Sequence, residues 1–131
     1  ISYTVAKQYE RFSKWVDMVT VMGNVNSDVI GKLSGVVLVA NMSNNSFDST
    51  KSASKIIDMY PERVIGFVTQ YRIKDYPFFN MTPGIHLSTH KDGDQNYRKK
   101  EDVDTDIIIV GRGIYKSENV VTSAELYRTI C

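Results

Sequence analysis

The clearest candidate for chemistry in this sequence is an arginine between two glycines, in Val-Gly-Arg-Gly-Ile at 110–114. Glycine lets backbone N–H groups approach an anion closely, and the guanidinium group offers paired donors that match two oxygens of a phosphate. The segment also ends the most apolar run of the chain. We therefore expect Arg112 and Gly113 to belong to a phosphate-binding site.

Three other segments are polar or turn-forming, and each is ambiguous when taken alone. Ser43 opens a polar stretch directly after an apolar run, and a lone serine there favours a turn or helix-cap residue. The Pro83-Gly84 pair predicts a tight turn. Residues 91–100 are polar and locally basic, which is typical of a solvated loop.

The elements that must position these residues are predicted by short, β-branched apolar runs, which favour buried strands. The clear runs are 36–40, 64–68 and 107–110, and weaker ones are 16–21 and 78–81. Because the runs are continuous rather than alternating, they are typical of a parallel sheet covered on both faces.

Segments with helical spacing of apolar residues lie between the strands, at 4–14, 49–60 and 117–130. Ser49 or Thr50 is a candidate cap for the second helix, and Ser123 a candidate late start for the third. Alternation of strand and helix predicts an α/β fold with right-handed crossovers. In such folds the loops at the carboxyl ends of strands hold the ligand.

Length and composition narrow the class of protein. The 131 residues suit one domain, and 42% hydrophobic with 24% charged residues is typical of a globular protein. A net charge of +1 gives no global attraction to nucleic acid or to an anionic membrane, so any anion site must be local. The single cysteine, Cys131, excludes an internal disulfide framework and favours a cytoplasmic location.

Six segments, in order along nearly the whole chain, resemble the orotidine monophosphate decarboxylase family. They are Thr-Val-Ala-Lys-Gln-Tyr at 4–9, Asn-Met-Ser at 41–43, Val-Ile-Gly-Phe-Val-Thr-Gln at 64–70, Met-Thr-Pro-Gly-Ile at 81–85, Gln-Asn-Tyr-Arg at 95–98 and Asp-Ile-Ile-Ile-Val-Gly-Arg-Gly-Ile at 106–114. Each segment is weak evidence alone, whereas six in order with strand and helix spacing between them are strong evidence.

This resemblance implies a (β/α)₈ TIM barrel, of which residues 1–131 supply about the last five strands and their helices, with no internal domain boundary. It implies a lyase that decarboxylates orotidine 5'-monophosphate (OMP) to uridine 5'-monophosphate (UMP) in de novo pyrimidine biosynthesis. It also implies that the reaction uses no metal or organic cofactor, and that the enzyme is a homodimer with its sites at the subunit interface.

The resemblance also suggests roles for single residues at the phosphate end. Arg112 and Tyr97 resemble the side-chain phosphate ligands, with the backbone N–H of Gly113 nearby. Gln95 resembles a residue that reaches both phosphate and pyrimidine from a mobile loop.

At the other end of the nucleotide, Ser43 resembles the side chain that hydrogen-bonds the pyrimidine edge. Pro83 resembles an apolar wall near the reacting carbon. Thr4 resembles a residue that is lent across the dimer to the neighbour's ribose site.

The family's catalytic segment, Asp-x-Lys-x-x-Asp, is followed by an isoleucine that resembles Ile1, so the resemblance puts both carboxylates and the lysine just before Ile1. Those groups stress or preorganise the substrate carboxylate, stabilise the carbanion and deliver the proton. We therefore expect residues 1–131 alone to be inactive and to require the amino-terminal half of the barrel.

Three features depart from the family pattern. Asn41 stands where the family has an acidic residue, Asp94 stands where a glycine is expected, and the connection at 23–35 is short. An acidic residue beside a phosphate site is unfavourable unless it points away. These departures support an alternative, a non-catalytic nucleotide-binding or scaffolding relative, and an unrelated five-stranded flavodoxin-like domain is the third interpretation.

Overall fold

The computed structural model describes residues 2–44 and 46–130, so the predictions made on Ile1 and Cys131 lie outside the described residues. Five strands form one parallel sheet, as predicted. Two strands of three residues each form a second, antiparallel sheet. The parallel strands are β1 (Val19–Met22), β2 (Val36–Val39), β3 (Val64–Val68), β4 (Phe79–Pro83) and β7 (Ile107–Ile109).

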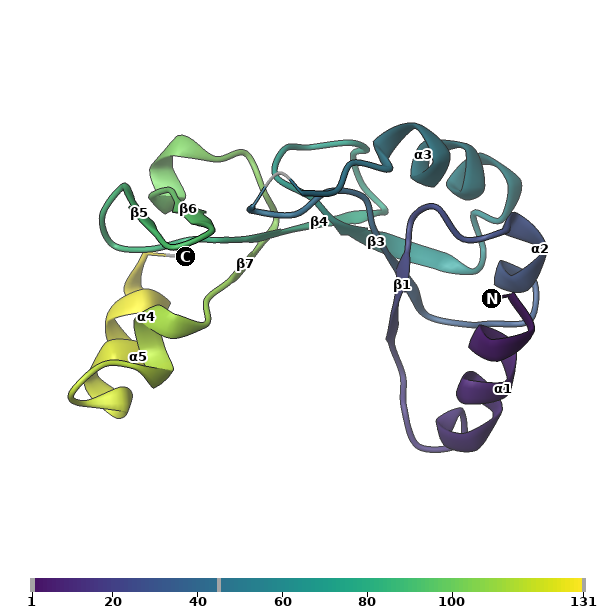
Figure 1. The fold of residues 1–131 in the computed structure, drawn as a ribbon, viewed down its shortest axis with the longest axis horizontal. Helices are drawn as coiled ribbons and strands as arrows, with labels where there is room; N and C mark the ends of the chain where they lie inside the picture. Colours follow the sequence, from purple (N-terminus) through teal and green to yellow (C-terminus); the bar gives the residue numbers. More distant parts are fainter. Residues whose placement is uncertain (1, 45, 131) are drawn as a thin grey trace.

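The strands lie side by side in chain order, β1-β2-β3-β4-β7, and every neighbouring pair is parallel. A flavodoxin-like sheet reverses its strand order near the middle. The order found here has no reversal, so the flavodoxin-like interpretation is wrong. Sequential parallel order is that of a (β/α)₈ barrel, and this sheet corresponds to a five-strand part of one. Figure 1 shows it as an arch with β1 and β7 toward opposite ends.

The predicted helices are present as α1 (Ser2–Phe12), α3 (Thr50–Met59) and α5 (Val120–Thr129). Ser49 stands at the predicted N-cap position of α3, but its hydroxyl donates to the carbonyl of Val39 at 3.1 Å and makes no capping hydrogen bond. The late start predicted at Ser123 is wrong. Asn119, whose side chain accepts from the backbone N–H of Thr122 at 3.0 Å, caps α5. The helix therefore begins before Ser123.

Shorter helical pieces, not predicted as separate elements, are α2 (Ser27–Ile30), α4 (Arg112–Tyr115) and the 3-10 turn η1 (Lys100–Asp102). The solvated loop predicted at 91–100 is also wrong in part, because it contains an antiparallel hairpin, β5 (His90–Asp92) and β6 (Gln95–Tyr97). Gly93 turns the hairpin with φ +60°, a conformation that favours glycine at a two-residue turn.

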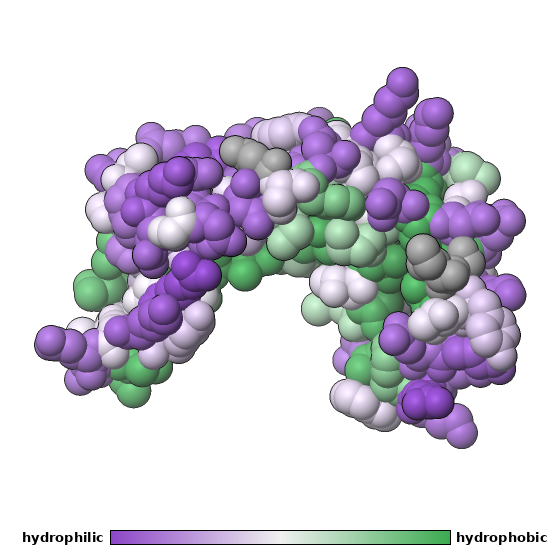
Figure 2. All heavy atoms as spheres, in the orientation of Figure 1, coloured by the Kyte–Doolittle hydropathy of each residue, from purple (hydrophilic) through white to green (hydrophobic). Residues whose placement is uncertain are grey.

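The core lies between the sheet and helices α2 and α3. Its fully buried members include Phe67 of β3, Leu38 of β2 and Ile57 of α3. Continuous apolar strands supply one side of this core, and the apolar stripe of α3 supplies the other. The end of the sheet near β7 lacks such a layer, and Ile107 and Ile109 are 41% and 39% exposed. Figure 2 shows apolar residues gathered on the underside of the arch.

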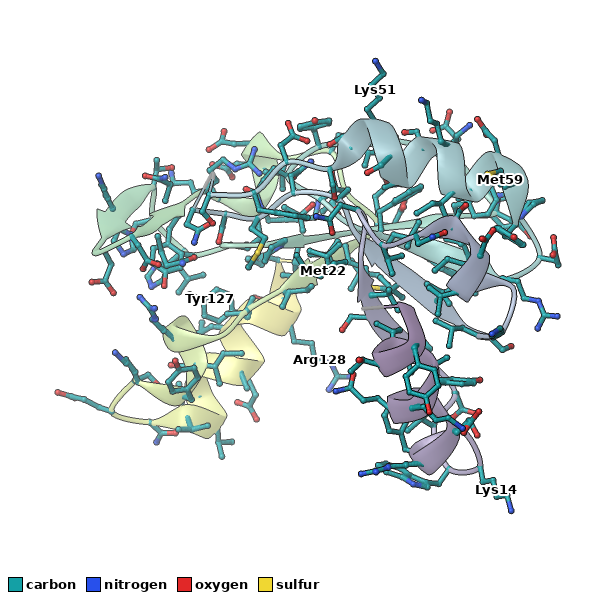
Figure 3. The ribbon with its side chains drawn as sticks, turned by 45° about the vertical axis from the view of Figure 1, so that its right-hand side comes forward. Lys14, Met22, Lys51, Met59, Tyr127 and Arg128 are labelled. Carbon is teal, nitrogen blue, oxygen red and sulfur yellow. The ribbon has the colours of Figure 1, made fainter. Side chains whose placement is uncertain are left out.

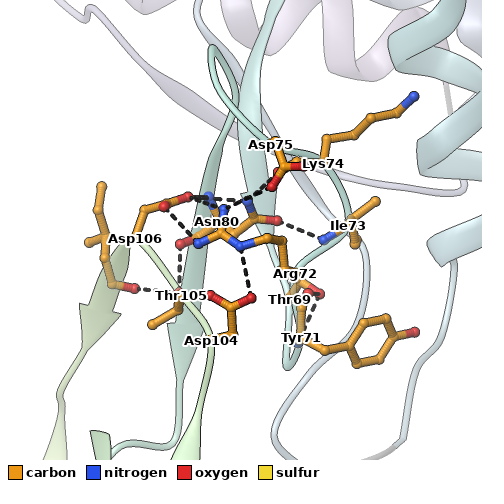
Figure 4. Close-up of polar contacts among 11 residues, drawn as sticks. Thr69, Tyr71, Arg72, Ile73, Lys74, Asp75, Asn80, Asp104, Thr105 and Asp106 are labelled. Carbon is orange, nitrogen blue, oxygen red and sulfur yellow. Dashed lines mark hydrogen bonds and ion pairs between the residues drawn. The ribbon is translucent and has the colours of Figure 1, made fainter. Parts of the chain in front are cut away.

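A polar network joins the connection after β3 to the start of β7 (Figure 4). Arg72 donates to Asp106 through both terminal nitrogens, at 2.9 and 3.2 Å, and to Asp104 at 3.0 Å. The fully buried Asn80 donates its backbone N–H to Asp106 at 2.8 Å. These bonds, first that from Arg72 and then that from Asn80, lower the pKa of Asp106 to about 2. The network fixes β4 relative to β7. Of the predicted site residues, Pro83 ends β4 and Arg112 follows shortly after β7.

Asp106→Asn is expected to lower the free energy of unfolding at neutral pH by about 1 to 2 kcal/mol, as for hydrogen bonds to a charged group at a partly exposed position. Because the pKa of Asp106 is lowered in the folded chain, its contribution is full above about pH 4 and is lost as the pH falls toward about 2. The difference between variant and wild type must therefore shrink in acid.

Urea unfolding at about pH 7 and about pH 2.5 measures this difference. Glu62→Gln, the same chemical change on an exposed residue, is the matched control. An Asp106→Asn variant that loses the same stability at both pH values would contradict the role of the network.

Candidate functional site

Two residues predicted from distant parts of the sequence meet in the structure. Ser43, just after β2, donates its hydroxyl to the side-chain oxygen of Gln95 on β6 at 2.5 Å. Ser43 is only 9% exposed, so this bond lies in a partly buried position at the carboxyl ends of the strands. The Gln95 amide uses its oxygen in this contact, which leaves its NH₂ group as the donor end toward a ligand.

The turn after β4 packs directly behind this pair. Gly84 has φ +75°, and a Cβ atom placed on it would lie 2.8 Å from the Cβ of Ser43. The carbonyl of Pro83, the last residue of β4, accepts from Gln70 at 3.4 Å, and Arg98 in turn donates to the Gln70 side chain at 2.9 Å. The predicted tight turn therefore brings Pro83 beside the Ser43 position and ties it to the hairpin.

The three predicted phosphate residues line one cavity of about 310 Å³. Tyr97 of β6 is buried in its wall, and Arg112 and Gly113 enter it from α4. The whole lining comprises His86, His90, Asp92, Tyr97, Arg112, Gly113, Lys116 and Ser117. Since Gln95 and Tyr97 are two apart on one strand, their side chains lie on the same face of the hairpin. The Ser43–Gln95 pair and this anion pocket are therefore adjacent.

Acidic side chains of the hairpin face Arg112. Asp92 lies 3.7 Å and Asp94 lies 3.9 Å from its terminal nitrogens. Asp94 is expected to suit a phosphate site only if its side chain points away from it. In this structure the side chain faces Arg112 instead. Sequence reasoning missed Asp92, because the predicted loop gave it no direction. The pKa of Arg112 is raised, first by its electrostatic interaction with Tyr97, then by a hydrogen bond to Tyr115 and by the charge of Asp92. Arg112 therefore stays a cation.

Two histidines complete the wall, and sequence reasoning missed both. The ring centroids of His86 and His90 are 4.5 Å apart in an edge-on contact, and His90 stacks on Tyr97 at 4.9 Å. Burial and, secondarily, the charge of His90 lower the pKa of His86. The available signal was that the only two histidines of the sequence stand four apart, between a predicted turn and a predicted polar loop.

Helix α5 packs closely against Gly113. A Cβ atom on Gly113 would overlap the hydroxyl of Tyr127 and lie 3.1 Å from the ring of His86. Tyr127 is only 3% exposed, whereas the next residue, Arg128, points away from the pocket side of the helix (Figure 3). Only glycine allows the backbone after Arg112 to pack this closely against α5.

Thr4 does not join the other predicted residues within one chain. It is exposed on α1, at the β1 end of the sheet, and the anion pocket lies at the β7 end. A larger cavity of about 690 Å³, lined mostly by apolar residues of α1 and β1, also lies at the β1 end and holds none of the predicted site residues.

Asn41 has a structural role that its position in the sequence did not reveal. Its NH₂ group donates to Thr50 at 3.0 Å and Thr69 at 3.3 Å, and its oxygen accepts from the backbone N–H of Gln70 at 2.6 Å. These bonds satisfy an almost fully buried amide and join the ends of β2 and β3.

Within residues 2–44 and 46–130, no helix is both long enough and apolar enough to cross a bilayer. The same residues contain no group of three or more His, Cys, Asp or Glu side chains arranged to hold a metal ion. The candidate site therefore consists of hydrogen-bond donors and acceptors, fixed charges and two histidines.

A parallel sheet in sequential order, with a cationic pocket and a polar pair where its strands end, defines an α/β protein of the barrel class with a candidate ligand site at the carboxyl ends of its strands. Comparison with protein-family models matches residues 1–127 to the Orotidine 5'-phosphate decarboxylase / HUMPS family. The chain belongs to this family.

Named relatives agree with this assignment. A uridine 5'-monophosphate synthase from Bos taurus is 34% identical over 150 residues, covering 98% of this chain and 31% of that protein. Orotidine 5'-phosphate decarboxylases from Phycomyces blakesleeanus and Saccharomyces cerevisiae are 31% and 30% identical over 98% of this chain, covering 57% and 58% of their own lengths. The chain thus spans about a third to three fifths of these relatives.

Gly84→Ala is expected to disturb the site more than Gly93→Ala. Both positions have positive φ, so either alanine carries a backbone strain of about 1 to 3 kcal/mol. Only at Gly84 would the new methyl group press on Ser43, since nothing lies within 4 Å of a Cβ at Gly93. Urea unfolding and the NMR signals of the Ser43 and Gln95 amides test this. Equal displacement of those signals in both variants would contradict the packing described.

Proposed function

We propose that this chain supplies the phosphate- and pyrimidine-binding part of an orotidine 5'-monophosphate decarboxylase. The observation that carries the proposal is the position of β6: Gln95 contacts Ser43, and Tyr97, two residues on, lines the pocket that contains Arg112. One short strand thus connects a polar pair suited to a pyrimidine edge with a cationic pocket suited to a phosphate.

The roles follow from the donor and acceptor chemistry of each side chain. Arg112 offers a bidentate contact to phosphate oxygens, and the backbone N–H of Gly113 and the hydroxyl of Tyr97 add further donors. Ser43 and the amide of Gln95 can both donate and accept, as the N–H and C=O groups of a pyrimidine edge require. Pro83 closes the site with an apolar wall. The nucleotide is OMP as substrate and UMP as product.

Further barrel strands are proposed to complete the sheet. Apolar side chains on three strands of the sheet, Met22, Phe79 and Ile107, are each between 41% and 45% exposed. Strands β1 and β7, at the two ends of the described sheet, each pair on one side only. Unpaired parallel edges and exposed apolar strand residues are costly in water. An amino-terminal half of the barrel, packed against β1 and β7, would cover both.

Catalysis is proposed to need that amino-terminal half. The 131 residues contain no Asp-x-Lys-x-x-Asp segment, and loss of CO₂ from a pyrimidine leaves a carbanion that needs a nearby cation and proton donor. Within the described site, Arg112 and Lys116 lie in the phosphate pocket, and Arg98, near Pro83, is held by the carbonyl and side-chain oxygens of Gln70 at 2.7 and 2.9 Å. Residues 1–131 therefore bind nucleotide but do not decarboxylate it.

A homodimer is proposed to bring Thr4 to the ribose. The exposed position of Thr4 on α1 leaves its hydroxyl accessible to a second subunit.

We also place the enzyme in the cytoplasm, since a single cysteine suits a reducing compartment.

The second candidate function is nucleotide binding without catalysis. Asp92 and Asp94, both within 4 Å of Arg112, favour it because they oppose a phosphate there. In this alternative, completing the barrel restores no decarboxylation, although UMP still binds.

UMP binding should depend on Arg112. We expect Arg112→Ala to weaken UMP binding about 10- to 100-fold, the scale for losing hydrogen bonds to a charged group at a partly exposed site. Isothermal titration calorimetry measures the affinity, and Arg128→Ala on the exposed side of α5 is the matched control. If wild type and Arg112→Ala bind UMP equally, or neither binds it, the phosphate role of this pocket is wrong.

Decarboxylation should appear only in a complete barrel. We expect residues 1–131 alone to release no CO₂ from OMP, and a chain extended upstream by a family segment that carries Asp-x-Lys-x-x-Asp to release it. Replacing that lysine with alanine in the extended chain is the control for the added segment. Persistent inactivity of the extended chain with intact UMP binding would favour the non-catalytic alternative.

A further inference from the structure

The two histidines of the anion pocket belong to none of the six segments that carry the family resemblance, because they lie between 81–85 and 95–98. They are nevertheless built into the wall that contains Arg112. His90 stacks on Tyr97 with ring planes 30° apart, and His86 contacts both Tyr97 and Tyr127 at ring distances of 5.5 and 6.1 Å. A role for them therefore has to be argued from their own contacts.

Their hydrogen bonds distinguish the two rings. The Nδ1 atom of His90 lies 3.0 Å from the carbonyl oxygen of Ser88, and since a carbonyl only accepts, Nδ1 carries the proton. A further proton on this ring then goes to Nε2 without breaking that bond. In contrast, Nδ1 of His86 accepts from the backbone N–H of Ser88 at 3.3 Å. Protonation of His86 would remove that acceptor, so the two rings differ in what a second proton would break.

On the Arg112 side of the pair, the other charges are balanced. Arg112 and Lys116 provide two cations in the pocket, and Asp92 and Asp94 provide two anions on the hairpin. The titratable or charged groups that face the histidines are Asp92 from β5, Asp94 from the turn, Tyr97 from β6, Arg112 and Lys116 from α4 and its end, Tyr127 from α5 and, on the far side of His86, Lys99, Lys100 and Glu101. One added positive charge on His90 therefore makes the pocket net positive.

We propose that His90 is a further anion-binding residue of this pocket, and that its protonation increases the affinity for a phosphate or sulfate dianion in mildly acidic solution. The inference rests on the proposed phosphate site and adds to it a ligand whose charge changes with pH. Histidine is the side chain that changes charge between about pH 5 and pH 8.

Sulfate is the suitable probe, because it stays a dianion while a phosphate monoester takes up a proton near about pH 6. Calorimetric titration of the full chain with sulfate, at about pH 7.5 and about pH 5.5 and constant ionic strength, measures the effect. We expect binding about tenfold tighter at the lower pH, as for one added charge close to the anion at a partly exposed site.

Variants separate the two histidines. His90→Asn is expected to lose the increase in acid, because asparagine cannot gain the charge. His86→Asn is the matched control and is expected to keep most of the increase. His90→Lys carries a fixed charge, so it is expected to bind sulfate tightly at both pH values. Circular dichroism of each variant checks that it is folded.

The outcomes test the two proposals separately. Equal sulfate affinity of the wild type at both pH values, or an unchanged increase in His90→Asn, would overturn the role of His90 and leave the phosphate site in place. Absence of sulfate binding at either pH, or binding that Arg112→Ala leaves unchanged, would overturn both proposals.

Discussion

The hydrogen bond from Ser43 to Gln95 joins the end of β2 to the hairpin, and the arrangement of the site depends on it. The two residues are 52 positions apart, and the bond forms because parallel strands in chain order bring their carboxyl ends to one edge of the sheet. The hairpin is short and mostly exposed, so few apolar contacts hold it. With Gln95 anchored to Ser43, Tyr97 on the same strand is fixed against Arg112, and the polar pair and the anion pocket become parts of one site.

Electrostatic balance is the second constraint on this site. In the structure Arg112 is paired with Asp92 and Asp94, at 3.7 and 3.9 Å from its terminal nitrogens. The same carboxylates oppose an incoming phosphate, so binding requires the hairpin to shift or the local charge to change. Lys116, His86 and His90 lie where they can offset this opposition. As proposed, protonation of His90 would change the charge of this pocket, whereas the buried amide of Asn41 is fully hydrogen-bonded and neutral.

Much of the fold could be predicted from the sequence, because it depends on local patterns. The five apolar runs became the five parallel strands, and Gly113 and the Pro83-Gly84 turn pointed to real close approaches of the backbone. The hairpin was missed because the polarity of residues 91–100 outweighed the turn-forming Gly93. The directions of Asp92, Asp94 and the histidines could not be predicted, since tertiary contacts with α4 and α5 set them. For Ser43, the pattern alone favoured a cap, and the family resemblance was needed to suggest a ligand role.

The measurement that tests the account most directly is a titration of the isotopically labelled chain with UMP, followed by amide NMR. If the site binds the nucleotide as described, the largest shift changes fall on Ser43, Gln95, Tyr97 and Gly113, which come from three separate segments, while residues of the cavity between α1 and β1 stay unchanged. Shift changes confined to the α1–β1 cavity, or their absence at Ser43 and Gly113 under saturating UMP, would contradict the account.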